Sequence, residues 1–328
     1  MRDDEQVLRE TEVWFVRHGL PYFADGLRTQ VEAGLARKAV AGVGALTVLA
    51  GLLAGLLVEA DFPTRLLAGM LVAGVVVVGY GLARLRVWPM ARWALGHTFD
   101  SLGLLFPLAT RALPLLLLFM TFLFINTEVW QVATTMDHGV LWVAVLLFAA
   151  FAIGFLLVRL PEEVDRADDA MGGVRLLRGC QGTPVEEVAE RYADDDVAEI
   201  AQVRGYEAGN LVFVLLVTQA VQVLLLSLAV YLFFVIFGAV AINEHVMLTW
   251  LGKGEVHWLI PGWHVISLEL LQVSTFLAAF AGLYFTVYAV TDETYRTQFF
   301  GSLLDDLQRA IAVRAVYRLL RRSPEPER

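Results

Sequence analysis

The chain has 328 residues, of which 58% are hydrophobic and 18% are charged, and its formal net charge at pH 7 is −9. With a mean hydropathy of +0.63, it is too apolar for a soluble protein of this length. Long apolar segments alternate with charged ones, which is typical of an all-α protein whose helices cross a bilayer and not of a transmembrane β-barrel.

Residues 1–38 form a charged segment before the first apolar run. Five side chains recur at helical spacing and share one face of a predicted helix: Val7, Leu8, Thr11, Trp14 and Phe15. The sequence His18-Gly19-Leu20-Pro21 ends this helix. We expect it to lie on the membrane surface or to pack against another cytoplasmic helix. The segment lacks a short apolar core followed by a cleavage site, so we do not expect a cleavable signal peptide.

Six charge-free runs are candidates for membrane spans. They cover Ala39–Val58, Leu66–Ala83, Ala112–Thr127, Gly139–Val158, Ala208–Asn243 and Leu270–Thr291. A hydrocarbon core of about 30 Å requires roughly 20 helical residues, and the third run has 16. The apolar residues Leu102–Thr110 lengthen this run if the side chain of Arg111 extends toward the interface. The 36 residues of the fifth run predict one tilted helix that projects beyond the bilayer.

The positions of the basic residues predict the orientation of these spans. If the N-terminus is cytoplasmic, 23 Lys and Arg residues lie on the cytoplasmic side, and only Arg65 and Lys253 lie in the outer loops. Tryptophans near the outer ends of the spans fit an aromatic belt: Trp130, Trp142, Trp250, Trp258 and Trp263. The preference for Arg over Lys suggests a GC-rich bacterial genome. We therefore expect a multi-pass protein of a bacterial plasma membrane with both termini in the cytoplasm.

Together with residues 1–38, the pattern divides the chain into five parts. Residues 39–158 hold spans one to four in two hairpins, residues 208–291 hold spans five and six with an outer loop, and residues 292–328 form a cytoplasmic basic amphipathic helix and tail. Residues 159–207 are acidic and have too few large apolar side chains for a core of their own. In this segment Thr183-Pro184-Val185-Glu186 matches a capping box with Pro at the first helical position, so we expect a cytoplasmic helical connector.

The last predicted helix runs from about Thr294 to Arg322. One face carries Arg314, Arg318, Arg321 and Arg322, and the opposite face carries Ala312, Val313, Val316, Leu319 and Leu320. A basic amphipathic helix is typical of contact with anionic lipid headgroups. The alternative is that this helix packs on the other cytoplasmic helices. A protein partner at these cytoplasmic helices is compatible with either arrangement.

Polar residues inside the predicted spans suggest a second candidate region. Gln219 and Gln222 share one face of span five, and Glu269 and Gln272 share one face at the start of span six. Their burial in lipid would be unfavourable, so we expect them to face the bundle interior and plausibly one another. Two interpretations remain open: an interhelical hydrogen-bond network, or the wall of a polar permeation path or substrate pocket.

Signatures of other chemistry are weak in this sequence. The outer loop between spans five and six carries Glu244, His245, Glu255, His257, His264 and Glu269, but their spacing matches no zinc motif, and we predict no metal site. No motif of a soluble enzyme or of an intramembrane protease occurs, and we predict neither catalytic residues nor a cofactor. The basic residues follow membrane topology, which argues against nucleic-acid binding.

Three segments resemble a family of integral membrane proteins of uncharacterised activity found in actinobacterial genomes. They are Leu116–Gln131, Gly182-Thr183-Pro184-Val185, and Gly282–Asp292 continuing through Tyr295-Arg296. The similarity extends through most of the chain. It implies membrane insertion and carries no activity, cofactor or site residue with it.

These observations favour a non-enzymatic integral membrane protein that acts as a structural or interaction component through its cytoplasmic helices. The alternative is a channel or transporter that uses the polar faces of spans five and six. Apart from the lipid bilayer, we expect an anionic lipid or a protein as partner.

Overall fold

The computed structural model describes residues 4–100, 114, 116–169, 171–193, 197–252, 255–260, 262–291 and 293–322. Within these ranges the chain forms 14 labelled α-helices, the further helix Leu116–Phe124, two 3-10 helices and one two-stranded antiparallel sheet, which confirms the predicted all-α class. In the first half these are α1 (Asp4–Arg17), η1 (Pro21–Phe23), α2 (Asp25–Gly34), α3 (Arg37–Leu57), α4 (Phe62–Arg84), α5 (Val87–Asp100), α7 (Thr127–Thr135) and α8 (His138–Asp169). In the second half they are α9 (Gly173–Cys180), α10 (Glu186–Ala189), η2 (Glu190–Tyr192), α11 (Ala198–Ala201), α12 (Tyr206–Ala241), α13 (Glu244–Leu251), β1 (Trp258–Ile260), β2 (Trp263–Ser267), α14 (Leu268–Thr291) and α15 (Glu293–Arg322).

Five described helices, α3, α4, α8, α12 and α14, are long and apolar enough to cross a membrane. A sixth candidate is a bent pair, in which Leu116–Phe124 meets α7 at 75°. The prediction that the third run continues as one straight span to Thr127 is therefore wrong at its C-terminal end. The side chain of Asn126 accepts hydrogen bonds from the backbone N–H groups of Glu128 and Val129, so it caps a new helix there. Arg111 and the apolar residues before it lie outside the described residues.

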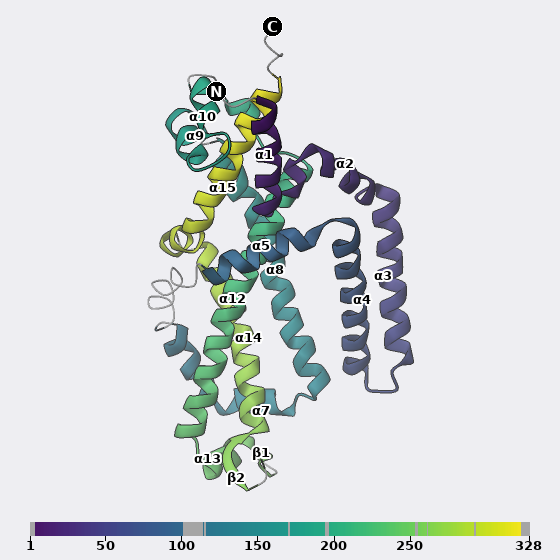
Figure 1. Ribbon diagram of the computed structural model, residues 1–328. Coiled ribbons are helices and arrows are strands. Elements are labelled where there is room, and N and C mark those ends of the chain that lie inside the picture. The colour runs from purple at the N-terminus through teal and green to yellow at the C-terminus, as the bar shows by residue number, and fades with distance from the viewer. Residues whose placement is uncertain are drawn as a thin grey trace, which may run out of the picture.

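Helices α8, α12 and α14 pack along one another and form the centre of the molecule (Figure 1). As expected, the fifth run is one unbroken helix, and its 36 residues extend about 54 Å. α12 and α14 are antiparallel, and two glycines permit their close approach. A Cβ on Gly238 would lie 2.3 Å from a methyl of Leu270, and one on Gly282 would lie 2.3 Å from the hydroxyl of Ser227.

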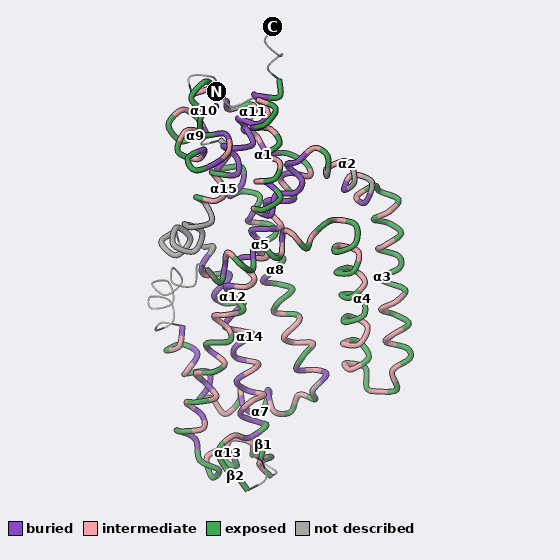
Figure 2. Tube along the Cα trace, viewed as in Figure 1, coloured by how far each residue is buried: buried purple, intermediate pink, exposed green. Residues whose placement is uncertain are grey.

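The hairpin of α3 and α4 stands beside this central group (Figure 1). Neither helix has a buried residue, as Figure 2 shows along their whole length. Their backbones approach closely, since a Cβ on Gly69 would lie 2.7 Å from the carbonyl oxygen of Gly51. At the base of the hairpin, the hydroxyl of Tyr22 donates to the carbonyl of Leu85 at 2.6 Å. From there α5 turns across the central group and packs on α12.

At one end of the molecule, a unit that we call the head combines α1, η1, α9, α10, η2, α11 and residues 305–322 of α15 (Figure 1). Its buried core joins the two ends of the chain to the acidic segment: Phe15 of α1, Leu176 and Cys180 of α9, and Ile311 and Val316 of α15 all belong to it. The acidic segment therefore shares a core with other helices, which agrees with its having too few apolar side chains for one of its own.

Two local predictions in this region have opposite outcomes. The helix of the N-terminal segment is confirmed and ends at Arg17, and it packs on α15. The capping box at Thr183 is wrong, because the hydroxyl of Thr183 donates to the carbonyl of Cys180 at 2.6 Å. The helix α10 begins three residues later, and the carboxylate of Glu186 accepts from the backbone N–H of Gly182 at 2.9 Å.

At the opposite end of the molecule lie α7, α13 and the hairpin of β1 and β2 (Figure 1). Trp130 of α7 is fully buried here, and its Nε1 donates to the carbonyl of Phe124 at 2.6 Å. Its assignment to an aromatic belt is therefore wrong, since it is a core residue below the bend of the broken span. Trp142 is exposed, as a belt residue would be.

Candidate functional site

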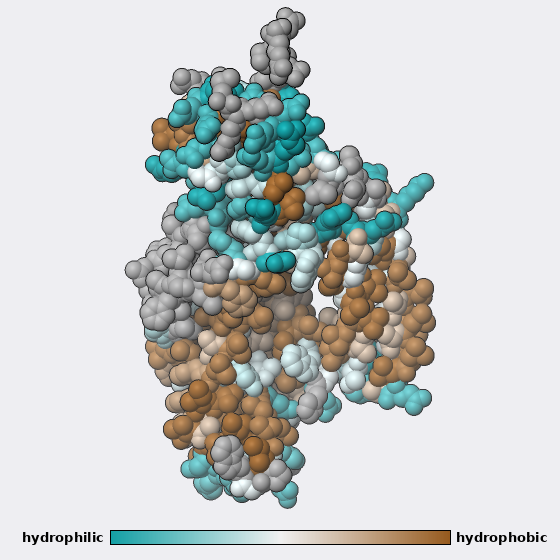
Figure 3. All heavy atoms as spheres, viewed as in Figure 1, coloured by the Kyte–Doolittle hydropathy of each residue, from teal (hydrophilic) through white to brown (hydrophobic). Residues whose placement is uncertain are grey.

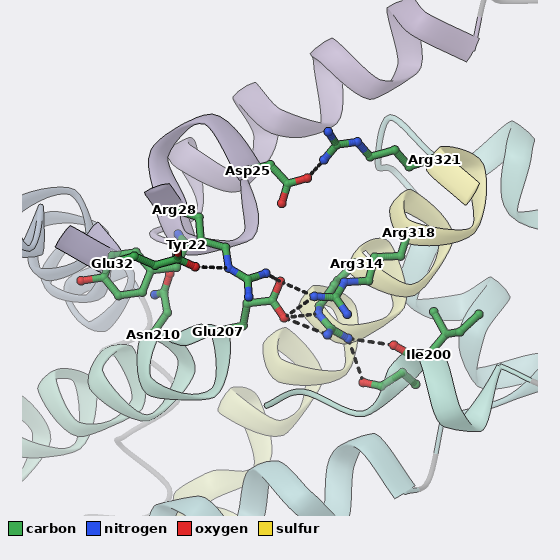
Figure 4. A network of polar contacts seen from close by, with 11 residues as sticks. Tyr22, Asp25, Arg28, Glu32, Ile200, Glu207, Asn210, Arg314, Arg318 and Arg321 are labelled. Atoms are coloured by element: carbon green, nitrogen blue, oxygen red, sulfur yellow. Dashed lines mark hydrogen bonds and ion pairs between the residues drawn. The ribbon is translucent and has the colours of Figure 1, made fainter. Parts of the chain in front are cut away.

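The most connected group of buried charges lies where α12 enters the head, around Glu207 (Figure 4). Gly205 has a φ of +63°, a conformation that glycine adopts readily, and it turns the chain into α12. Glu207 therefore lies in the first helical turn and is only 3% exposed. Its carboxylate accepts from Nε of Arg314 at 2.8 Å and from Nη2 of Arg318 at 2.9 Å. A third guanidinium, that of Arg28, lies 3.8 Å away.

Arg314 is 2% exposed, and its hydrogen bonds hold it rigidly. Its Nη2 also lies 2.8 Å from Glu207, and its Nη1 donates to the carbonyls of Ile200 and Ala201 at 2.9 and 3.2 Å. Burial lowers the pKa of Arg314 and the adjacent Glu207 raises it. A guanidinium has so high an ordinary pKa that this one stays charged, so the pair is a buried ion pair.

Neighbouring contacts tie both ends of the chain to the first turns of α12 (Figure 4). The side chain of Asn210 donates to the carbonyl of Gly19 at 2.8 Å and accepts from the backbone N–H of Tyr22 at 3.1 Å. An ion pair joins Asp25 to Arg321. Segments that are far apart in sequence thus meet at a single helix terminus.

A cavity of about 310 Å³ opens beside this network. Its walls are Phe23, Asp25, Glu207, Arg314, Tyr317, Arg318, Arg321 and Arg322. The four arginines that the sequence placed on one helix face are therefore brought together in one site. The hydroxyl of Tyr317 donates to the carboxylate of Glu12 at 2.7 Å, and burial raises the pKa of this tyrosine.

The surroundings of α15 decide between the two arrangements considered for this helix. All eight residues of positions 310–317 are buried, so the helix is enclosed on every side over two turns. Arg314 reaches no surface, and for this residue the structure favours packing against other helices over contact with lipid headgroups. Headgroup contact stays a prediction for Arg318, Arg321 and Arg322, of which Arg321 and Arg322 are exposed.

The polar residues of spans five and six do not form one group. Gln219 and Gln222 are buried in α12, Glu269 is buried in the first turn of α14, and Gln272 is half-buried. The expectation that the two pairs face one another is wrong, because the antiparallel register of α12 and α14 separates Gln222 from Gln272 by about 20 Å along the helix axis.

Gln219 and Gln222 also make fewer contacts than a hydrogen-bond network would provide. Among the described residues, neither polar atom of the Gln219 side chain has a hydrogen-bond partner, nor has Oε1 of Gln222. A buried amide without a partner destabilises a fold by about 1–3 kcal/mol. The interhelical hydrogen bonds expected for these two residues are therefore not seen here.

Glu269 belongs instead to the end of the molecule opposite the head. Its carboxylate accepts from the backbone N–H of His257 at 3.1 Å and lies 2.8 Å from Nδ1 of the same residue. A second pair, His264 and Glu244, is 3.4 Å apart. These two pairs fasten the β1–β2 hairpin to α14 and α13. Within the described part of the chain, no group of three or more His, Cys, Asp or Glu side chains could hold a metal ion.

A larger, apolar cavity of about 590 Å³ lies between α8, α12 and α14. Four hydroxyl-bearing residues interrupt its apolar wall: Ser227, Tyr231, Thr275 and Thr286. None of the four polar residues predicted for a permeation path lines it. Figure 3 shows that the surface over these helices is hydrophobic, as expected at the depth of the bilayer, whereas the head is mostly hydrophilic.

Sequence reasoning missed Glu207 and Asn210 as members of the site. A signal was present, since both are polar residues at the start of a 36-residue apolar helix. It pointed to the helix start and not to the partners, which lie 107 residues away at Arg314 and 191 residues away at Gly19.

Comparison with known proteins found no relative: the chain matches no protein-family model, no curated protein and no solved structure. Its long apolar helices make it a possible multi-span membrane protein. At one end, a buried core holds the helices of the head together.

Proposed function

We propose that the protein is a non-enzymatic component of a bacterial plasma membrane, that its head lies in the cytoplasm, and that the head binds another protein. The observation that carries this proposal is a groove of about 640 Å³ on the head, beside α1 and the start of α2. It is lined by Arg9, Glu12, Val13, Val16, Arg17, Ala24 and Gly26.

The chemistry of the groove suits an amphipathic helix of a partner. Val13 and Val16 are both exposed, although they are three residues apart on one face of α1. Charged side chains of both signs, Arg9, Glu12 and Arg17, surround them. An apolar floor with a polar rim is the usual arrangement of a helix-binding groove. Figure 3 shows a small hydrophobic patch in this part of the otherwise hydrophilic head.

The groove also lies on a rigid support. The opposite face of α1 inserts Val7 and Phe15 into the core of the head, and Glu12 accepts the hydrogen bond of Tyr317. Since the head is joined to α12 by the buried pair of Glu207 and Arg314, a partner held at α1 would be fixed relative to the membrane.

The test replaces one groove residue by a charged one. Val13→Glu should abolish the retention of a partner when the protein is crosslinked and purified from its native membrane, because it places a charge on the apolar floor. Val174→Glu is the matched control: Val174 is 73% exposed on α9 and lies outside the groove. Equal retention by both variants would contradict the proposal, and so would equal loss.

One observation favours the alternative of a channel or transporter, namely the buried side chains of Gln219 and Gln222 without described partners. Gln222→Leu separates the two functions. A permeation path should lose ion or solute flux in proteoliposomes when an amide in its wall becomes apolar. A protein without a path should show no flux in either form, and its stability should be unchanged or higher.

A further inference from the structure

The arginine-lined cavity of the head carries more positive than negative charge. Its walls hold four guanidinium groups, at Arg314, Arg318, Arg321 and Arg322, and two carboxylates, at Asp25 and Glu207. The neighbouring pair of Arg28 and Glu32, 3.1 Å apart, adds no net charge. The walls therefore hold two more guanidinium groups than carboxylates. Two further carboxylates lie just outside them: the buried Asp168 acts electrostatically on Arg314, and Glu12 accepts the hydrogen bond of Tyr317.

The arrangement of these groups is fixed before any ligand binds. Glu207 is shared by Arg314 and Arg318, so one carboxylate faces two guanidinium groups. Two backbone carbonyls hold Arg314, which leaves it no freedom to move toward water. Arg314 already has its carboxylate and its carbonyls, whereas Arg318 is half-buried and Arg322 is exposed, so these two guanidinium groups remain open to an anion that enters from solvent.

The walls also indicate which anion fits. Arginine side chains bind phosphate and carboxylate groups through two parallel hydrogen bonds, and a charge excess of two matches a phosphate monoester better than a single carboxylate. The volume of about 310 Å³ is at the lower end of ligand pockets, so the phosphate can carry only a small organic group. The rings of Phe23 and Tyr317 supply an apolar wall for that group.

We propose that this cavity binds a phosphate group, carried by a small phosphorylated molecule or by a lipid headgroup. The guanidinium groups of α15 hold the phosphate, and the ion pair of Arg321 with Asp25 joins the last turn of α15 to the start of α2. Because α2 leads directly into α3, the site connects the C-terminal helix of the head to the α3–α4 hairpin. It shares no lining residue with the groove at α1, so it extends the proposed function and does not depend on it.

The test uses the full chain in nanodiscs of neutral phosphatidylcholine, with inorganic phosphate as the probe and chloride at equal ionic strength as the reference. Phosphate at about 10 mM should raise the thermal midpoint by about 2–4 °C, since a ligand that binds only the folded state stabilises it. Arg322→Gln should remove this shift, and because Arg322 is exposed, the variant should fold. Arg309→Gln, an exposed position on the same helix outside the cavity, should retain it.

A second arm identifies the source of the phosphate. Nanodiscs of phosphatidylcholine with phosphatidic acid, a monoester lipid, and without inorganic phosphate should give no shift if the ligand is soluble, and should give the full shift if it is a headgroup. In either case the shift must disappear in Arg322→Gln and persist in Arg309→Gln. The proposal is overturned if neither phosphate nor phosphatidic acid shifts the wild type, or if Arg322→Gln responds as the wild type does.

Discussion

The α3–α4 hairpin and the head are both built from helices, but they are held together in opposite ways. The hairpin has no buried residue, whereas positions 310–317 of α15 are buried without exception (Figure 2). The hairpin is also the more apolar of the two, with a hydropathy of 2.2 in α3 and 2.3 in α4. Apolar composition therefore marks the helices that need lipid around them, and burial within the protein marks those that do not.

The two regions also differ in their polar contacts. The head depends on directional bonds between distant segments, such as those of Glu207 and Asn210. The hairpin depends on close backbone approach at Gly51 and Gly69, where no polar side chain takes part. A substitution should thus act on one region and leave the other intact, and the following variants test that separation.

The largest effect is expected for Glu207→Ala. It leaves the buried guanidinium of Arg314 without its carboxylate, and removal of one partner from a buried ion pair destabilises by about 3–5 kcal/mol. Cys180 reports the change. Burial, with a smaller contribution from Glu186, raises the pKa of Cys180 to about 12, so this thiol should react with maleimide at pH 8 only when the head opens. The rate of labelling should rise about 100-fold or more in the variant.

A surface ion pair provides the control for this experiment. Glu5 and Arg9 lie 3.1 Å apart on α1, with both side chains about two-thirds exposed, so Glu5→Ala should destabilise by less than about 1 kcal/mol. If both variants labelled at similar rates, the pair of Glu207 and Arg314 would not hold the head together.

Within the hairpin, Gly69→Ala should have the next largest effect. The added Cβ would lie 2.7 Å from the backbone oxygen of Gly51, so α3 and α4 must separate, with an expected destabilisation of about 1–3 kcal/mol. Loss of helicity in an SDS titration measures it. Gly74→Ala on the same helix is the control, because nothing lies within 4 Å of its Cβ. Labelling of Cys180 should be the same in both, and a faster rate in Gly69→Ala would show that the hairpin and the head are not independent.

Tyr22→Phe tests the junction between the two regions and should have a smaller effect. Losing the hydrogen bond to the Leu85 carbonyl should cost about 1 kcal/mol at neutral pH. Burial raises the pKa of Tyr22 to about 12, from an ordinary value of about 10, so the folded state holds this proton more tightly than the unfolded state. Its contribution to stability is complete below about pH 10 and is lost as the pH rises toward 12.

Denaturation midpoints measured between pH 8 and pH 12 test whether stability falls as Tyr22 ionises. The variant should lose less stability than the wild type over that interval. Some loss should remain in the variant, because burial also raises the pKa of Tyr317. Parallel curves for the two proteins would mean that Tyr22 is not buried as described.

The spans could be predicted because the hydropathy of consecutive residues is enough to locate them. The run Ala39–Val58 became α3 with its start shifted by two residues, since the thickness of the bilayer fixes the length of an apolar helix whatever packs beside it. The bend after Phe124 escaped this reasoning, because hydropathy does not register that Asn126 can cap a new helix.

The site could be predicted only in part. The arginines of α15 were found because helical periodicity groups them, but the same periodicity suits a surface helix equally well. That Arg314 is buried depends on Glu207, which lies 107 residues away in sequence, and no local pattern encodes such a contact. The expectation that Gln219 and Gln222 face Glu269 and Gln272 was wrong for a reason already present in the sequence: antiparallel spans bring the middle of one helix to the middle of the next and not to its end.

The smallest effect tests whether lipid covers the hairpin. Val48 on α3 is 62% exposed and Val316 on α15 is fully buried, so the same substitution to Ala removes the same two methyl groups from opposite surroundings. Val316→Ala should destabilise by about 2 kcal/mol, from lost transfer energy and the cavity left behind. Val48→Ala should change stability in nanodiscs by less than about 0.5 kcal/mol, because acyl chains fill the vacated space and are as apolar as the methyl groups they replace. If Val48→Ala were as costly as Val316→Ala, a protein surface would have to cover α3, and a second copy of the chain would be the first place to look for it.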